Sequence, residues 1–359
     1  MYEDDSDGSD DDWFFNSIKR YDDLLMYDLH GVLSCITFND SDRFLVAVTR
    51  ENVNEIWELS IPEKLVLGKN SLPSKNRDFS MITAGYTTEK ILQMVAVPIG
   101  FVASHSKDVI IYSIPSSHDF SDVIKQKLKI RSCDEPASLV TIKDKIYSCC
   151  RLSDVEAYDL STELSISLQP PNISKTEVSR VDTIGCMRSS QLGLSLGLKG
   201  SCTVVTLDRR DGSTASVIYE PSIHQNNNGL TSTESFTFDI TPDGIYIALA
   251  SSKGNIKVYD TRNSKKAILS KNIYVGESPV FHNIKFGSSS LLSVSGYDRL
   301  VHIFDIKSSL SELTNVFRHD GHRNTGIKTI VTHEWHPSSD NLIFSADNTG
   351  ELQSWTFKS

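Results

Sequence analysis

Residues 256–260 read Ile-Lys-Val-Tyr-Asp, and residues 301–305 read Val-His-Ile-Phe-Asp. In both stretches apolar and polar residues alternate before an aromatic residue and an aspartate, a pattern typical of a half-buried β-strand. Seven stretches share this form, and their anchors, the residues before the final polar position, are Trp57, Tyr112, Tyr158, Leu207, Tyr259, Phe304 and Trp355. Consecutive anchors are 45 to 55 residues apart. Because each interval has room for three more short strands, the period indicates the blades of a β-propeller.

The last blade needs a strand from elsewhere, because the chain ends four residues after Trp355. Residues 24–31 read Leu-Leu-Met-Tyr-Asp-Leu-His-Gly, are strand-like, and precede the first complete set of strands. We expect this segment to pair with the last blade and close the ring, which removes exposed sheet edges. The sequence therefore predicts an all-β fold: a seven-bladed propeller over residues 24–359, closed by an N-terminal strand and preceded by a short helix.

Composition limits the classes of function. The 359 residues include 36 Lys+Arg and 46 Asp+Glu, for a formal net charge of −10, and 39% are hydrophobic. That apolar content suffices for a sizeable core, and the acidic balance disfavours direct binding to nucleic acid or to an anionic membrane. No apolar run reaches the roughly 18 residues that span a bilayer, and the N-terminus lacks a secretory signal pattern. We expect a cytoplasmic protein, with the nucleus as an alternative.

Catalytic and metal-binding patterns are weak in this sequence. The P-loop, the GxSxG elbow and the Rossmann glycine pattern do not occur. His319, His322, His333 and His336 fall within eighteen residues, but His333 and His336 flank Trp335 at an odd interval. On a strand that interval turns their side chains to opposite faces, so they cannot share one site. We expect no enzyme activity, no cofactor and no metal.

The cysteines show no CxxC pair and no histidine at zinc-ligand spacing. We expect buried free thiols, as a reducing compartment favours, at Cys35, Cys133, Cys149, Cys150, Cys186 and Cys202.

The repeats resemble those of the WD40-repeat propeller family from about residue 24 to the C-terminus. The last repeat carries the resemblance most clearly, with Gly321-His322 at its start, Ser345 and Asp347 around its inner hairpin, and Trp355 at its end. In that family a His, Ser, Asp and Trp of this kind form a hydrogen-bonded network. The resemblance therefore implies a structural network of His322, Ser345, Asp347 and Trp355. The sequence departs from the family pattern at Thr356, where an aspartate is expected.

A narrower resemblance is to the family of WD repeat-containing protein 73, and three groups of residues carry it. They are Asp12-Trp13, Ser17-Ile18, Tyr21, Asp23-Leu24 and Asp28-Leu29-x-Gly31; then Asn54-Glu55-Ile56, Leu59-x-Ile61-Pro62 and Arg77-Asp78-Phe79; and last Thr332-His333-x-Trp335-His336-Pro337. The resemblance implies a non-enzymatic scaffold that binds and stabilises the heterodimer of Integrator subunits 9 and 11 in the cytoplasm. It also implies that this RNA endonuclease is held inactive before maturation, and that BRCA1-associated ATM activator 1 is a partner.

Two other functions stay open at this point. The same family is associated with microtubules and the mitotic spindle, which implies an adaptor with microtubule-associated partners at spindle poles. Separately, Tyr259-Asp260-Thr261-Arg262 resembles the element by which some propellers join cullin-4 ubiquitin ligases as substrate receptors. An arginine at this position also often pairs locally with its own blade.

Residues 1–12 form an acidic segment that we expect to be disordered. Its acidic residues, Glu3, Asp4, Asp5, Asp7, Asp10, Asp11 and Asp12, account for seven of the ten net negative charges. The segment either is a solvated tail or binds a partner, where its carboxylates would meet a basic groove or the metal centre of a nuclease. Ser9 precedes three aspartates and resembles an acidic-directed phosphorylation site.

Residues 13–23 follow as a predicted short amphipathic helix. Trp13, Phe14, Ile18, Tyr21 and Leu25 recur near helical spacing and would share one aromatic face. That face either packs on the propeller or docks into a groove of a partner, since clustered aromatic side chains are typical interface anchors. Trp13 and Phe14 are therefore candidate partner-binding residues.

Overall fold

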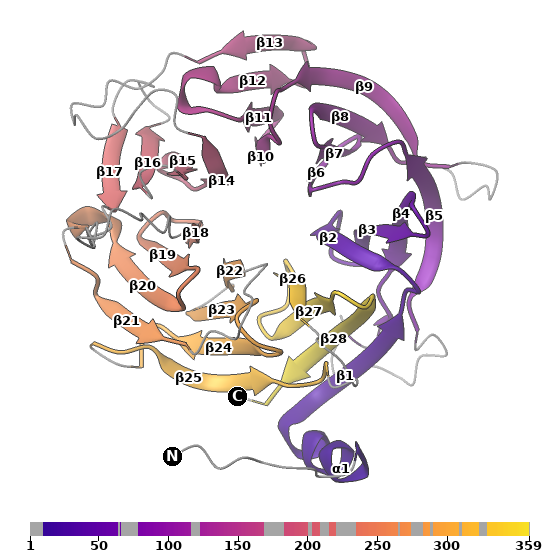
Figure 1. Ribbon diagram of the computed structural model, residues 1–359, viewed down its shortest axis with the longest axis vertical. Coiled ribbons are helices and arrows are strands. Elements are labelled where there is room, and N and C mark those ends of the chain that lie inside the picture. Colours follow the sequence, from indigo (N-terminus) through magenta and orange to yellow (C-terminus); the bar gives the residue numbers. More distant parts are fainter. Residues whose placement is uncertain are drawn as a thin grey trace, which may run out of the picture.

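The computed structural model of the chain describes residues 10–63, 65, 78–115, 123–168, 183–199, 203–208, 215–219, 235–264, 266–273, 283–287, 290–308, 311–322 and 329–358. Within these residues, strands β1 to β28 form seven four-stranded antiparallel sheets. The sheets stand as blades around a central opening (Figure 1). The prediction of a seven-bladed β-propeller is confirmed.

Each blade runs outward from the central opening in four strands. The first strands are β2 (Val32–Phe38), β6 (Gln93–Val97), β10 (Ser138–Ile142), β14 (Ile184–Ser189), β18 (Phe236–Ile240), β22 (Asn283–Phe286) and β26 (Ile330–Trp335). The second strands are β3 (Arg43–Arg50), β7 (Gly100–Ser104), β11 (Lys145–Cys149), β15 (Gly193–Leu198), β19 (Tyr246–Ser251), β23 (Leu291–Ser295) and β27 (Leu342–Asp347).

The third strands carry the anchors. They are β4 (Val53–Ser60), β8 (Asp108–Ser113), β12 (Glu156–Asp159), β16 (Thr203–Asp208), β20 (Asn255–Asp260), β24 (Val301–Asp305) and β28 (Glu351–Phe357). The outer strands are β5 (Ser80–Thr87), β9 (Lys125–Ser132), β13 (Leu164–Ser167), β17 (Ala215–Tyr219), β21 (Leu269–Asn272), β25 (Thr314–His319) and β1 (Tyr21–Asp28). All seven anchors are buried. Their side chains therefore belong to the core, as the alternating pattern predicts.

The seventh blade combines both ends of the chain. Strand β1 lies antiparallel to β28, with Leu24 opposite Trp355, and forms the outer strand of that blade (Figure 1). Gly350, at the turn before β28, has φ +96, and a Cβ there would lie 2.1 Å from the carbonyl oxygen of Gly31. Only glycine fits this turn without moving the backbone that leaves β1.

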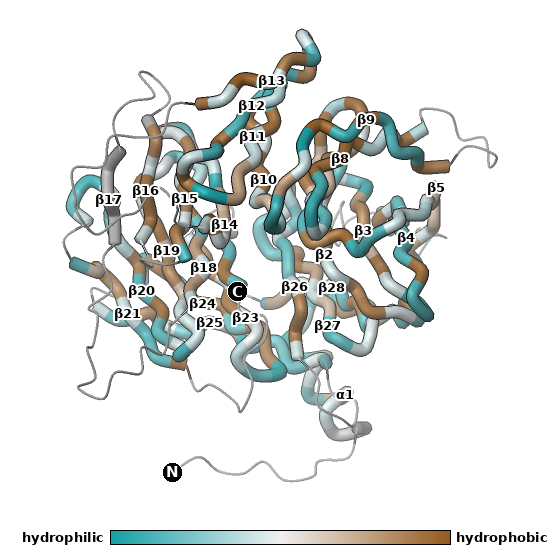
Figure 2. The backbone as a smooth tube through the Cα atoms, turned by 45° about the horizontal axis from the view of Figure 1, so that its top comes forward, coloured by the Kyte–Doolittle hydropathy of each residue, from teal (hydrophilic) through white to brown (hydrophobic). Residues whose placement is uncertain are grey.

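The core lies between neighbouring blades. Apolar residues lie within the strands, and the connecting turns are mostly hydrophilic (Figure 2). Between the first and seventh blades, Phe44 and Phe344 have ring centroids 5.0 Å apart, and Phe79 stacks on Phe344 at 5.8 Å. Tyr27 of β1 reaches the same cluster, 4.0 Å from Phe79. Burial of such aromatic side chains is a large apolar contribution to the junction at which the ring closes.

Helix α1 (Asp10–Arg20) precedes β1. The sequence placed the helix at residues 13–23, but Tyr21 already pairs with Phe357 in the sheet and is buried. Tyr21 and Leu25 therefore lie on a strand, not on the aromatic face of the helix that their spacing suggested. Of the aromatic residues in the predicted face, Trp13 and Phe14 lie in α1. Short 3₁₀ turns, η1 (Leu152–Asp154) and η2 (Thr261–Asn263), follow β11 and β20. Among the described residues, no helix is both long and apolar enough to cross a lipid bilayer.

Candidate functional site

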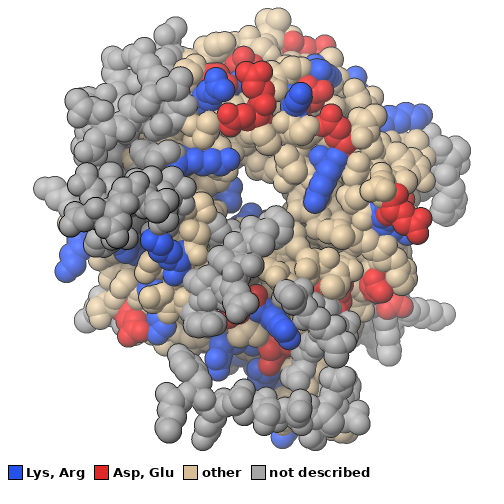
Figure 3. All heavy atoms as spheres, viewed as in Figure 1, with Lys and Arg blue, Asp and Glu red and all other residues tan. Residues whose placement is uncertain are grey.

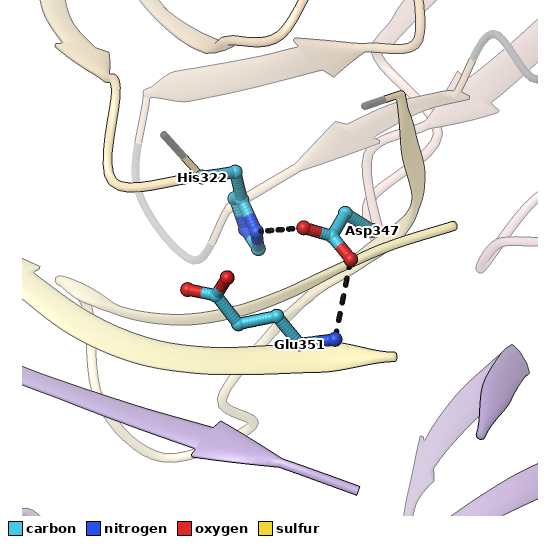
Figure 4. A group of neighbouring side chains, drawn as sticks. All are labelled: His322, Asp347 and Glu351. Atoms are coloured by element: carbon cyan, nitrogen blue, oxygen red, sulfur yellow. Dashed lines mark hydrogen bonds and ion pairs between the residues drawn. The ribbon is translucent and has the colours of Figure 1, made fainter. Parts of the chain in front are cut away.

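The hydrogen-bonded network implied by the WD40 resemblance lies in the seventh blade, and Figure 4 shows two of its members, His322 and Asp347, with the neighbouring Glu351. His322 Nδ1 is 3.1 Å from Asp347 Oδ2, and His322 Nε2 is 3.0 Å from Ser345 Oγ. Trp355 Nε1 donates to the same serine oxygen at 3.1 Å. All four residues are buried. The network therefore links the segment before the first strand of this blade to its second and third strands, a structural role.

Asp347 also holds the turn between β27 and β28. Its Oδ1 accepts hydrogen bonds from the backbone N–H groups of Thr349 at 2.9 Å and Glu351 at 3.2 Å, and from the Thr349 hydroxyl at 2.7 Å. Ligand atoms of His322, Asp347 and Glu351 lie within 4.8 Å of one another, close enough to hold a metal ion. However, both ring nitrogens of His322 already have protein partners, which accounts for the cluster without an ion.

The other histidines of this region contact different blades. His333 is buried, and its Nδ1 and Nε2 lie 2.7 Å from the hydroxyls of Ser295 and Ser293. Burial lowers the pKa of His333 to about 3. His336 follows β26, and its Nε2 is 2.6 Å from the carbonyl oxygen of Ser41. His333 thus bridges to the sixth blade and His336 to the first, so the two rings do not meet in one site.

A second polar cluster, which we term the seam, fastens the start of β1 to the end of β25, the outer strand of the sixth blade. The Tyr21 hydroxyl is 2.8 Å from His319 Nδ1, and Arg20 forms an ion pair with Asp320 at 2.5 Å. The His319 ring stacks on Trp355 with centroids 4.3 Å apart. Burial raises the pKa of Tyr21, and the nearby Asp320 carboxylate raises it further. The sequence did not reveal this cluster, because its members are about 300 residues apart and no local pattern joins them.

Only part of the acidic segment and helix is described. Glu3, Asp4, Asp5, Asp7 and Ser9 lie outside the described residues, and Asp10, Asp11 and Asp12 begin α1 with only their backbone described. Trp13 is partly buried, whereas the side chain of Phe14 is outside the description. Phe15 is 66% exposed, although it was not among the candidates. The run of three aromatic residues, Trp13-Phe14-Phe15, is the sequence feature that could have identified Phe15 as a candidate.

The ring encloses a channel with a cavity of about 1180 Å³, lined by the first strands. Inside it, Arg188 pairs with Asp239 at 3.0 Å, and Lys285 pairs with Glu334 at 2.8 Å. Asp239 also accepts a hydrogen bond from the backbone N–H of Phe286 at 2.7 Å. Each contact joins neighbouring blades, so these charged side chains are paired within the protein.

One opening of this channel, which we term the mouth, lies on the face where the first strands begin and the second strands end. Lys90, before β6, and Lys199, after β15, line the cavity at this end. Val32 and Leu92 line it too and are 42% and 44% exposed. On the face shown in Figure 3, Lys or Arg side chains lie on both sides of a hollowed central opening. Exposed apolar groups beside basic ones are typical of a protein-binding surface.

The segment that resembles a cullin-4 ligase element has a local partner. Arg262 is bound to Asp260 in a bidentate pair, with Nε–Oδ1 at 2.9 Å and Nη2–Oδ2 at 2.6 Å. The same aspartate accepts the backbone N–H of Arg262 at 2.9 Å and caps η2. The position of Arg262 is therefore explained by contacts within its own turn.

Comparison with known proteins agrees with the narrower resemblance. No family model matches the chain. The chain is 26% identical to a protein of Danio rerio named Integrator complex assembly factor WDR73, over 98% of this chain and 97% of the relative. Relatives of the same name from Homo sapiens and Xenopus laevis are 23% and 24% identical. The match covers 96% of the chain and 97% of the human protein, and 95% of the chain and 96% of the Xenopus protein. The similarity therefore extends over the whole propeller, and the predicted resemblance is confirmed.

Proposed function

We propose that this chain is a non-enzymatic assembly factor that binds and stabilises the heterodimer of Integrator subunits 9 and 11 in the cytoplasm and keeps the nuclease inactive until maturation. The observation that carries the proposal is similarity along 98% of the chain to a protein named as an Integrator complex assembly factor. A propeller suits this role, because a rigid ring presents loops from many blades to a large partner. BRCA1-associated ATM activator 1 is a further partner in this proposal.

The mouth is the surface that we assign to this partner. Lys90 and Lys199 supply positive charge, and Val32 and Leu92 supply exposed apolar area beside them. Apolar contacts at the centre of an interface provide most of the affinity, while complementary charges orient the partner and speed association. The fitting surface on the partner is an apolar patch with acidic neighbours.

The acidic segment provides a second contact in this proposal. Four of its seven acidic residues precede α1, and Asp10, Asp11 and Asp12 begin that helix. Farther along α1, Phe15 is exposed and Trp13 is partly buried. Carboxylates at this density favour a basic groove, such as the RNA-binding surface of a nuclease. Removing residues 1–9 should weaken binding at low salt and reduce its salt dependence, because fewer charges then contribute. Equal affinity and equal salt dependence for the shortened chain would exclude this contact.

Reconstitution from purified proteins tests the assembly role. The full chain is mixed with the heterodimer of Integrator subunits 9 and 11 from the same species and separated by size-exclusion chromatography with light scattering. The proposal predicts one stable complex containing one copy of each protein, and lower RNA cleavage by the heterodimer when the chain is bound. Separate elution of the chain and the heterodimer would contradict the proposal.

Purification of the tagged chain from cytosolic extract of its own cells separates the alternatives. Stoichiometric nuclease subunits support the assembly role. Tubulin-associated proteins in their place would favour a spindle adaptor, and a cullin-4 adaptor would favour a ligase receptor.

A further inference from the structure

Among the described residues, the outer edge of the third blade lacks the protection that the other six blades have. An edge strand presents unpaired N–H and C=O groups, and proteins protect such edges with charged side chains, irregular pairing or contacts from a neighbouring segment. Strands β1, β5, β9, β17 and β25 each pair with a shift of register. On β21, the carbonyl oxygen of Ser270 accepts a hydrogen bond from the N–H of Leu313, in the next blade, at 3.3 Å.

Strand β13 of the third blade lacks these protections, since no hydrogen bond from another blade reaches it within the described residues. Its four residues, Leu-Ser-Ile-Ser, carry no charge and pair with β12 without a register shift. The strand lies at the outer rim of the ring (Figure 1), where Leu164 is 63% exposed and Ile166 is 52% exposed. Because these positions differ by two, both side chains lie on one face of the sheet. A regular, uncharged and exposed edge can accept another strand.

The backbone groups of β13 that are open to such a strand follow from its pairing with β12. The N–H of Leu168, just after β13, donates to the carbonyl oxygen of Val155 at 2.8 Å. In an antiparallel ladder, residues that bond to the neighbouring strand alternate with residues whose N–H and C=O groups point away from it. Counting back from Leu168, Ser165 and Ser167 therefore direct their backbone groups outward, away from the blade.

We propose that β13 is a docking site for an extended segment of a protein partner, which adds to the third blade as a fifth strand. The backbone of the segment pairs with the N–H and C=O groups of Ser165 and Ser167. Aliphatic residues at alternate positions of the segment pack against Leu164 and Ile166. This docking site is separate from the mouth, because β13 lies at the rim of the ring and the mouth opens at its centre.

Charge and size define the segment that fits. The hairpin of β12 and β13, residues 156–167, contains three acidic residues and no basic residue. Glu163, in its turn, is exposed and forms no ion pair with another described residue. The segment therefore carries lysine or arginine beside its apolar residues. A second copy of this chain does not fit, because pairing two four-residue strands buries far less than the roughly 1,200 Å² of a stable interface.

Binding of a synthetic peptide to the full chain tests the proposal. The probe is a fluorescein-labelled peptide, Lys-Thr-Ile-Thr-Val-Thr-Ile-Lys, and fluorescence polarisation measures its affinity. We expect saturable binding, at least roughly tenfold weaker for the same peptide with N-methylated backbone amides, because the side chains remain but the donors are lost. Replacing both lysines of the peptide by glutamate should also weaken binding. Absence of saturable binding by the lysine peptide, or equal binding by its N-methylated form, would overturn the proposal.

Substitutions in the chain locate the site. Leu164→Lys/Ile166→Lys removes the apolar contacts and repels the lysines of the peptide, so affinity should fall at least roughly tenfold. Ser165→Pro removes an outward N–H but no hydrogen bond to β12, and should also weaken binding. The matched control, Val316→Lys, adds a lysine on β25 at a position that is 46% exposed and should bind within about twofold of the parent. Equal binding by all these chains would contradict the site.

Two further measurements complete the test. Circular dichroism checks that each variant is folded, and the N-methylated peptide tests the backbone pairing without any change in the chain. Light scattering of the parent and of Leu164→Lys/Ile166→Lys examines self-association. Both should be monomers. A parent dimer that this variant separates would identify a second copy as the occupant of β13 and contradict the assignment of a partner segment.

Discussion

Single residues in the seventh blade act through buried hydrogen bonds. His322 bridges Asp347 and Ser345, and Trp355 donates to the same serine. Because a buried polar group without a hydrogen-bond partner costs free energy, each residue of this network depends on the others for its partner. The seam continues this network outward, since His319 stacks on Trp355 and is hydrogen-bonded to the Tyr21 hydroxyl.

Removal of the Asp347 carboxylate should strongly destabilise the propeller. Asp347→Ala leaves His322 Nδ1 and the N–H groups of Thr349 and Glu351 without their acceptor. We expect the free energy of unfolding to fall by about 3 kcal/mol, measured by urea denaturation. The matched control is Asp305→Ala, which removes one acceptor for the backbone N–H of Lys307 on an exposed turn and should cost about 1 kcal/mol. Equal losses for the two variants would contradict a special role for the network.

The propeller should become less stable as the pH is lowered below neutral, in part because of His333. Its pKa is lowered to about 3 in the folded chain by burial, against about 6.5 when unfolded. Between these values the unfolded state binds the additional proton, so stability is lost as pH falls below about 6.5. At pH 5 His333 alone should remove about 2 kcal/mol relative to pH 8. His333→Gln, which retains hydrogen-bonding groups toward Ser293 and Ser295, should flatten this dependence in urea denaturation series; an unchanged slope would refute the assignment.

The elements at the N-terminus show where local pattern fails. Helical spacing predicted a helix over residues 13–23, yet Tyr21 lies in β1 because pairing with β28 and burial outweigh local propensity. The anchors were predictable, because each is set by alternation within its own strand. The seam could not be predicted in this way, since the ring brings β1 and the end of β25 together from distant parts of the sequence.

Strand β1 should be required for a soluble propeller, whereas α1 should not. A chain lacking residues 1–20 keeps β1 and its pairing with β28, but a chain lacking residues 1–28 exposes the edge of β28. Exposed edges promote aggregation, so the longer deletion should elute as aggregate and be cleaved rapidly by trypsin. The shorter deletion should elute as the parent does. A soluble, protease-resistant chain without β1 would show that the ring does not depend on this strand.

At the scale of the whole molecule, the acidity is largely local. Seven of the ten net negative charges lie in the first twelve residues, which leaves about −3 for the rest of the chain. The channel charges pair between blades, as Arg188 does with Asp239. Lys90 and Lys199 line the mouth with apolar side chains near them, and this is the surface that we assign to the proposed protein partner. Blade count and period alone could not identify this surface, because it forms only when ends of separate blades meet.

The most direct measurement is the affinity of the chain for the heterodimer of Integrator subunits 9 and 11, compared with that of a mouth variant. The variant Lys90→Glu/Lys199→Glu reverses two charges at the mouth. The control, Lys307→Glu, reverses an exposed charge after the third strand β24, on the opposite face. We predict that the parent and the control bind with affinities within about twofold, and that the mouth variant binds at least roughly tenfold more weakly. Absence of binding by the parent, or equal binding by all three chains, would contradict the account.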